Sequence, residues 1–270
     1  MKKSFFKFLT LLMICFGCSR NAYQDLASSD PDGYLLIQAQ AAINSVSYDS
    51  AIQILTVQVS ASSQAKPNFK QTLATAYAGQ CGLNFANFVS GLAAASSGTA
   101  FRLLMTPFVG IVSTPASCLL GLNMMESIAP TASRTTNQNA FVSVLGMALM
   151  GSQTRTSADT TPANGDGVVD VNLCNISDPD TNNIILGFGF MSKNFSALST
   201  QQLGSSSQTT LSNIISQCTA VAGSTCSITD PTLITASIRH TIRSLLNTVE
   251  YGLGSVVTNG NPVLINGACP

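Results

Sequence analysis

Charge is scarce in this chain. Only 9% of its 270 residues are Asp, Glu, Lys or Arg, against about 25% in typical globular domains. The 12 basic and 12 acidic residues balance, so the composition gives no electrostatic footprint for nucleic acid. No basic cluster predicts docking on anionic lipid. Uncharged polar residues, mainly Ser, Thr, Asn and Gln, must therefore solvate the surface.

Histidine and tryptophan are almost missing: the chain has one His, His240, and no Trp. One His cannot build a zinc site of several imidazoles, and no G-x-S-x-G motif supplies the nucleophile of a Ser-His-acid triad. We expect His240 to be a solvated surface residue. Arg239 and Arg243 flank it and are expected on a solvent-exposed helix face; the alternative is that this pair binds an anion. Residues 187–190, Gly-Phe-Gly-Phe, lack the strand context of a phosphate loop. The sequence therefore predicts neither an enzyme nor a cofactor.

Apolar residues, by contrast, are plentiful. They make up 45% of the chain, an ordinary fraction for a globular protein, so most of the chain is expected to be folded. The length fits one large domain or two small ones.

The N-terminus has a basic start, a short apolar run and a small residue. Met1-Lys2-Lys3-Ser4 and Lys7 supply the charge, residues 8–14 are mostly apolar, and Gly17-Cys18 follows. This order is typical of a secretory signal peptide. The apolar run is too short to cross the hydrocarbon core of a bilayer, which is about 30 Å thick. The sequence therefore predicts a signal peptide over residues 1–17.

The Gly17-Cys18 pair resembles the lipobox of bacterial lipoproteins. In that family signal peptidase II cleaves before the Cys, so the resemblance implies that Cys18 carries the acyl chains, such as palmitate. Ser19 stands where an Asp would retain such a protein at the inner membrane, and this implies the outer membrane. We expect the protein on the periplasmic face of that membrane, with exposure at the cell surface as the alternative. Two acyl chains are enough for a stable anchor. The alternative is an ordinary cleaved signal followed by an incidental Cys.

Six cysteines remain when Cys15 and Cys18 are set aside. An even number in an exported chain favours disulfides, and the absence of a C-x-x-C motif among these six argues against zinc. Many pairings are possible, but a short loop separates Cys218 from Cys226, so we expect these two to pair. The expected pairs among the other four cysteines are Cys81–Cys118 and Cys174–Cys269.

Apolar residues recur at helical spacing along most of the mature chain. The predicted fold is mainly α: a polar tether over 18–32, antiparallel helical hairpins over 33–98, and a helical bundle over 99–270. Residues 51–59 fit either a helix or an alternating strand. A helix from about Asn139 is apolar nearly all round, so it should be buried centrally.

The C-terminal part is predicted to hold three more helices and no strong β-hairpin. Apolar stripes indicate helices over 184–198, 211–221 and 234–253. Turns are expected from residue 259 to the end.

Tyr48-Asp49-Ser50-Ala51-Ile52, followed by Pro67, Leu73-Ala74 and Tyr77, resembles the middle of one tetratricopeptide repeat and the start of the next. In that family, small and large residues at these positions let two antiparallel helices pack closely and stack on their neighbours. The arrangement is also similar to exported lipoproteins that use such repeats as partners of periplasmic solute-uptake systems. The alternative is ordinary packing of helical hairpins without a family relation.

Residues 151–182 are polar and rich in turn-forming residues, which predicts a long loop or a domain boundary. Asp178 and Asp180 flank Pro179 and are expected in a turn of this loop.

Within this loop, residues 164–170 resemble the calcium loop of EF-hand and dockerin modules, in which alternating oxygens surround the ion. Pro162 and Leu173 occupy the end positions where that family carries ligands, so Asp159 or Asp178 would have to substitute. Bound calcium would staple the loop; the alternative is a solvent-exposed turn. The resemblance assigns the ligands to Asn164, Asp166, the carbonyl of Val168, and Asp170, with Gly167 at the turn and Val169 as an apolar plug.

Two functions fit these features. The favoured one is an outer-membrane-anchored, disulfide-stabilised helical lipoprotein that acts as a scaffold or binds a protein partner in the cell envelope. The alternative is a carrier that encloses a small apolar solute or lipid; a hydrolytic enzyme is the least favoured. A solid core with an open groove elsewhere would favour partner binding, whereas a carrier would need a closed pocket lined by Phe101, Met105, Phe108, Met147 and Met150.

Overall fold

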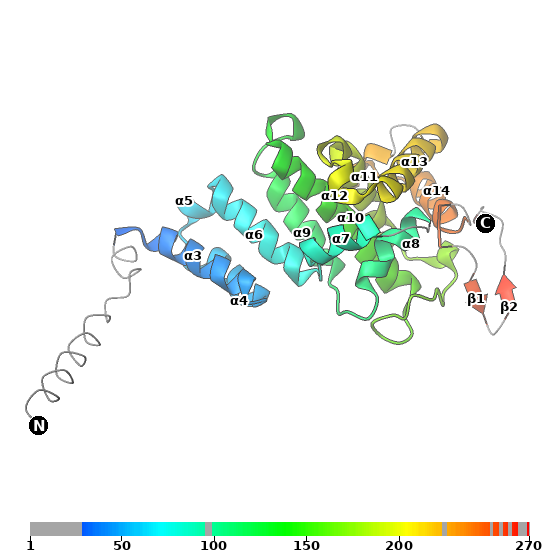
Figure 1. The fold of residues 1–270 in the computed structure, drawn as a ribbon, viewed down its shortest axis with the longest axis horizontal. Helices are drawn as coiled ribbons and strands as arrows, with labels where there is room; N and C mark the ends of the chain where they lie inside the picture. Colours follow the sequence, from blue (N-terminus) through cyan, green and yellow to red (C-terminus); the bar gives the residue numbers. More distant parts are fainter. Residues whose placement is uncertain are drawn as a thin grey trace, which may run out of the picture. The chain divides into compact units, whose positions relative to one another are not determined.

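The computed structural model is mainly helical in the part of the chain that it describes (Figure 1). The mainly α fold predicted from the sequence is confirmed. The chain forms two compact units, one up to Phe69 and one from Lys70 onward. This division falls inside helix α6 (Pro67–Gln80), whereas the sequence predicts the change of region near residue 98. The described residues are 29–94, 99–222, 226–248, 251–253, 256–258, 261–263 and 269.

The first unit is a helical hairpin. Helix α3 (Pro31–Asn44) begins where the side chain of Asp30 accepts the backbone N–H of Gly33, which satisfies one of the donors left free at a helix start. The chain then reverses, and both α4 (Tyr48–Gln53) and the π-helix η1 (Ile54–Gln58) pack against α3. Residues 51–58, left ambiguous by the sequence, are therefore helical. The short helix α5 (Ala61–Gln64) follows, and the side chains buried in this unit's core include Ala39, Ala51, Leu55 and Val59.

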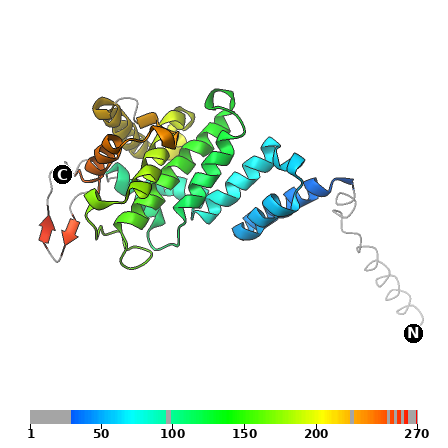
Figure 2. The same cartoon turned by 180° about the vertical axis from the view of Figure 1, so that it is seen from behind.

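The second unit is built around α10 (Thr136–Ala158) and α11 (Asp178–Asn194). These two helices pack along each other, with α8 (Ala100–Met105) and α9 (Pro115–Glu126) against α10, an arrangement that Figure 2 shows from behind. Helix α10 is buried on nearly every side along its length from Val142 to Arg155. The prediction that this helix is buried centrally is thus confirmed.

Glycines let these central helices touch backbone to backbone. A Cβ on Gly146 of α10 would lie 2.8 Å from the carbonyl oxygen of Gly187 in α11, and a Cβ on Gly187 would meet Gly146 in the same way. A Cβ on Gly151 would come even closer to the carbonyl oxygen of Leu104 in α8. The Gly-Phe-Gly-Phe segment at 187–190, which has no phosphate-loop context, is therefore a helix-packing motif.

The predicted loop over 151–182 is wrong at both ends. Helix α10 continues to Ala158 and α11 already starts at Asp178, so the loop covers only residues 159–177. The last turns of α10 carry polar residues, which hid the helix in the sequence, but Ser152, Gln153, Thr154 and Arg155 among them are buried. Gln153 donates to Asp180 (2.9 Å) and accepts from Asn183 (2.9 Å).

Three further elements differ from the prediction. Helix α9 was not predicted, and α14 (Ala236–Leu246) ends earlier than expected. An antiparallel hairpin of β1 (Val256–Thr258) and β2 (Asn261–Val263) replaces part of the expected C-terminal turns. The remaining elements are α7 (Phe85–Ala94), η2 (Thr106–Phe108), η3 (Thr131–Ser133), η4 (Leu173–Asn175), η5 (Phe195–Ala197), α12 (Thr200–Leu203), α13 (Ser205–Ala222) and η7 (Pro231–Leu233).

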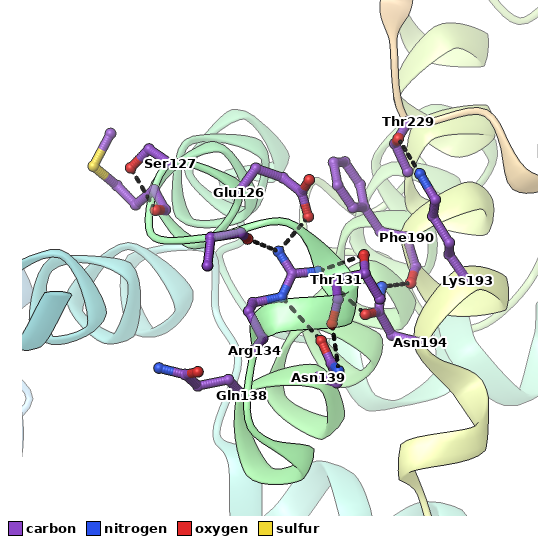
Figure 3. Close-up of polar contacts among 12 residues, drawn as sticks. Glu126, Ser127, Thr131, Arg134, Gln138, Asn139, Phe190, Lys193, Asn194 and Thr229 are labelled. Carbon is purple, nitrogen blue, oxygen red and sulfur yellow. Dashed lines mark hydrogen bonds and ion pairs between the residues drawn. The ribbon is translucent and has the colours of Figure 1, made fainter.

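Arg134, in the connection between α9 and α10, is a buried cation with all five N–H groups bonded (Figure 3). Its side chain is fully buried and pairs with Glu126 at 2.6 Å. It also donates to Asn139 of α10 (2.9 Å) and Asn194 of α11 (3.2 Å). The remaining two bonds go to the Ala129 carbonyl and the Thr131 hydroxyl. One guanidinium thus joins the ends of three helices.

None of the described helices is both long enough and apolar enough to cross a membrane.

Candidate functional site

The predicted lipid attachment site, Cys18, lies outside the described residues, as do the rest of the predicted signal peptide and most of the tether.

The six cysteines other than Cys15 and Cys18 form the three predicted pairs. Cys81–Cys118 joins the end of α6 to α9, and Cys218–Cys226 closes the short loop after α13. Cys174–Cys269 spans 95 residues and holds the last described residue against η4. In the usual chain-entropy account a disulfide that closes a longer loop stabilises more, so Cys174–Cys269 is expected to stabilise the fold more than the other two pairs.

The loop between α10 and α11 is organised by a buried carboxylate. Asp159 is 0% exposed and accepts the backbone N–H groups of Asp166 (3.0 Å) and Gly167 (2.8 Å). Arg155, also buried, donates to the Ala163 carbonyl at 3.2 Å. Burial lowers the pKa of the Arg155 guanidinium, and the charge of Asp159 opposes this shift. The loop is therefore tied to the end of α10 by two buried charged groups.

The residues assigned to calcium are bonded to protein groups instead. The Asp166 carboxylate accepts the N–H of Val168 (2.9 Å), and Asp170 accepts both the backbone N–H and the hydroxyl of Thr160. Partial burial raises the pKa of Asp170, but its hydrogen bonds from Thr160 and Thr161 outweigh this, so its pKa lies below the ordinary value.

The residues expected to bind calcium do not come together as a set of ligands in the described part of the chain. Asn164 is exposed, and its backbone carbonyl accepts the N–H of Gly110 (2.8 Å). Val169, the expected plug, is buried at 3% exposure. In the part of the chain that the structure describes, no three His, Cys, Asp or Glu side chains gather where they could hold an ion. Asp159, Asp166 and Asp170 each accept hydrogen bonds from loop donors, and calcium binding by this loop stays a prediction.

The Arg239–Arg243 pair, for which anion binding was the alternative to a solvated helix face, holds a carboxylate of its own chain. Asp178 lies in the first turn of α11, and not in the expected turn of the loop, because Ser177 caps the helix. Its two oxygens lie 3.0 Å from Arg239 and 2.6 Å from Arg243. The hydrogen bond from Arg243 lowers the pKa of Asp178. His240 is exposed, as predicted, but its Nε2 lies 2.8 Å from the Cys269 carbonyl oxygen.

The five residues proposed to line a carrier pocket form part of the solid core. Phe101, Met105, Phe108, Met147 and Met150 are each 0–1% exposed and belong to one continuous cluster of buried side chains.

A cavity of about 420 Å³ lies beside this core, between α7, α8, η2 and the segment that follows them. Of the five core residues above, only Phe108 reaches its wall. Phe108 pairs there with Phe88 at 5.9 Å between ring centroids. Asn87 and Thr106, also on its wall, are exposed, so the cavity opens to solvent. The sequence did not predict this cavity, because its wall comes from separate segments.

The N-terminal hairpin exposes apolar side chains at its turn and on η1. Val46 is 69% exposed and Val57 on η1 is 72% exposed. Val46 also has a positive φ of 62°, which is rare for a β-branched residue. Its N–H bonds the Ile43 carbonyl (3.0 Å) while the N–H of Ser47 bonds the Ala42 carbonyl (2.8 Å). This pair of bonds is the Schellman motif, whose left-handed position is usually Gly.

We expect Val46→Gly to stabilise the N-terminal hairpin by about 1 kcal/mol, because Gly takes the left-handed conformation without the steric cost of a Cβ. Urea unfolding and hydrogen exchange of the α3 and α4 amides would measure the gain. Val57→Gly is the matched control: it removes an equally exposed Val from a helical position, so it should lower stability slightly. A loss of stability with Val46→Gly would contradict the strained geometry.

No family model, curated protein or solved structure matches this chain.

Proposed function

We propose that this protein is a lipoprotein of the bacterial outer membrane that binds a protein partner in the cell envelope through its N-terminal helical hairpin. The predicted signal peptide over 1–17 would direct export, and acyl chains on Cys18 would hold the protein at the periplasmic face. The helical body would then act as a scaffold that presents the hairpin.

The observation that carries the proposal is the turn at Val46. A large apolar residue is exposed there in a backbone conformation that Gly or Asn would adopt at lower cost. Strain of this kind persists where the surrounding structure enforces it and is concentrated at functional sites. A π-helix, also frequent at functional sites, exposes Val57 in the same unit. A role in contacting a partner explains these features better than a role in stability alone.

The cysteine pairs support the export part of the proposal. Six paired cysteines suit an oxidising compartment such as the periplasm, because cytosolic thiols are normally kept reduced. An envelope lipoprotein would fold in that compartment.

The proposal is tested by site-specific photo-crosslinking in native membranes, with the reactive side chain placed at Val46. We expect one discrete protein adduct from Val46 and none from Leu233, an apolar residue of the other unit that is 59% exposed. In parallel, Cys18→Ser should move the protein from the membrane to the soluble periplasmic fraction, since the anchor would be lost.

Two results would count against the proposal. The same adducts from Val46 and Leu233 would mean that the hairpin is not the contact surface. If the Cys18→Ser variant stayed in the membrane fraction, this result would contradict a lipid anchor at Cys18.

A further inference from the structure

The cavity beside the core has the size and the walls of a small-molecule site. Its volume of about 420 Å³ lies within the roughly 300–1,000 Å³ that ligand pockets occupy. Most of its lining is apolar, and Leu83, Phe88, Leu103 and Phe108 on its wall are also members of the buried core. Leaving such a surface in contact with water is unfavourable, so an apolar ligand segment would gain by replacing that water.

Among the described residues that line the cavity, one is charged: Arg102. Its guanidinium is held in place by hydrogen bonds to the backbone carbonyls of Gly167 (3.2 Å) and Leu253 (2.8 Å). Within the described residues no carboxylate forms an ion pair with it. A fixed cation without an anionic partner, next to apolar walls, complements a ligand with an anionic head and an apolar chain.

Gly91 on α7 keeps part of this cavity open. It lines the cavity, and a Cβ added to it would have no atom within 4 Å. This contrasts with Gly146 and Gly151, where a Cβ would collide with a neighbouring backbone. Gly inside a helix costs about 0.5–1 kcal/mol relative to Ala, so helix stability would favour a larger residue at 91. Packing against neighbouring atoms therefore does not require Gly at this position.

We propose that this cavity binds a single-chain amphiphile with an anionic head, of the class of a medium-chain fatty acid. Its chain lies against Phe88, Leu103 and Phe108, and its carboxylate is directed toward Arg102. This inference goes beyond the proposed function, because it needs neither a protein partner nor the lipid anchor.

The test measures binding of three ten-carbon probes to the disulfide-bonded protein by isothermal titration calorimetry, below the concentration at which the probes form micelles. The probes are decanoate, decanol and decyltrimethylammonium. Decanoate is expected to bind at one site, about ten-fold or more tightly than decanol, because only the carboxylate gains charged hydrogen bonds. The cationic probe should bind most weakly.

Two pairs of variants locate the site. Gly91→Leu places a side chain in the cavity, and its Cβ meets no atom within 4 Å, so it should weaken decanoate binding at least about ten-fold while the protein stays folded. Ala86→Leu adds the same side chain to an exposed position of α7 outside the cavity and should leave binding unchanged. Arg102→Gln should make decanoate and decanol bind alike without loss of decanol binding, and Arg102→Lys should restore part of the preference.

The proposal is overturned if none of the probes binds, if decanol binds as well as decanoate, or if Gly91→Leu binds decanoate like Ala86→Leu. It is overturned as well if a photo-crosslinker at Asn87, on the exposed rim, captures an envelope protein while decanoate does not compete. The membrane fractionation and the crosslinks from Val46 are independent of these results, so either proposal can fail alone.

Discussion

Gly151→Ala is expected to destabilise the second unit by about 3 kcal/mol or more. The new Cβ would collide with the backbone carbonyl of Leu104, which belongs to α8 and cannot move aside like a side chain. Overpacking a close-packed core costs typically about 1–3 kcal/mol, and more when backbone must shift. Urea unfolding monitored by circular dichroism, with the disulfides intact, would measure the loss.

Gly91→Ala is the matched control, since it makes the same chemical change in another helix. Nothing lies within 4 Å of the added Cβ, so the better helix propensity of Ala should stabilise the protein by about 0.5–1 kcal/mol. The two substitutions should therefore differ in sign. If both had the same small effect, the close approach of α10 and α8 would be refuted.

Arg134→Ala is expected to destabilise the second unit by about 3 kcal/mol. Removing one partner of a buried ion pair costs about 3–5 kcal/mol, and the lower end applies because the Glu126 side chain is 35% exposed and can be solvated. The substitution also removes the Arg134 N–H groups that bond the amide oxygen of the buried Asn194 and the carbonyl oxygen of Ala129. Equilibrium unfolding in urea would give the free-energy difference.

Two further variants separate charge from geometry at this site. Arg134→Lys keeps the charge beside Glu126 but cannot supply five donors in a planar fork, so its stability should lie between those of the native protein and Arg134→Ala. Glu126→Gln keeps an acceptor for Arg134 and should cost less than Arg134→Ala. Equal stability of Arg134→Ala and the native protein would mean that this network does not join the three helices.

The elements best predicted from the sequence are those whose burial follows a simple period. The apolar stripes that start at Asn139 and at Ile184 fall on α10 and α11, although the second was expected to reach residue 198 and α11 ends at Asn194, because helices that bury one or more faces repeat every 3.6 residues. The short loop between Cys218 and Cys226 made that disulfide predictable from spacing. Where buried residues are polar, as Ser152 and Gln153 are, the period disappears and the helix end was mistaken for loop.

The candidate sites were predicted less well. The acid-rich segment at 164–170 offers the right oxygen atoms for calcium, but Asp166 and Asp170 are engaged by nearby loop donors. No local pattern shows that Asp159 is buried, or that Asp178 meets two arginines from α14. These contacts join residues distant in the sequence, so spacing alone could not reveal them.

By itself the sequence determined that this chain forms mainly helices, because periodic apolar residues and capping residues act within a few positions of one another. Only the tertiary structure decided which polar groups are buried and which glycines are needed. Arg134 and Asn194, 60 residues apart, meet in one hydrogen-bond network, and Gly151 is required only because α8 crosses it. The physical reason is that burial and close approach belong to pairs of segments: a residue's cost or benefit exists only once its distant neighbour is in place.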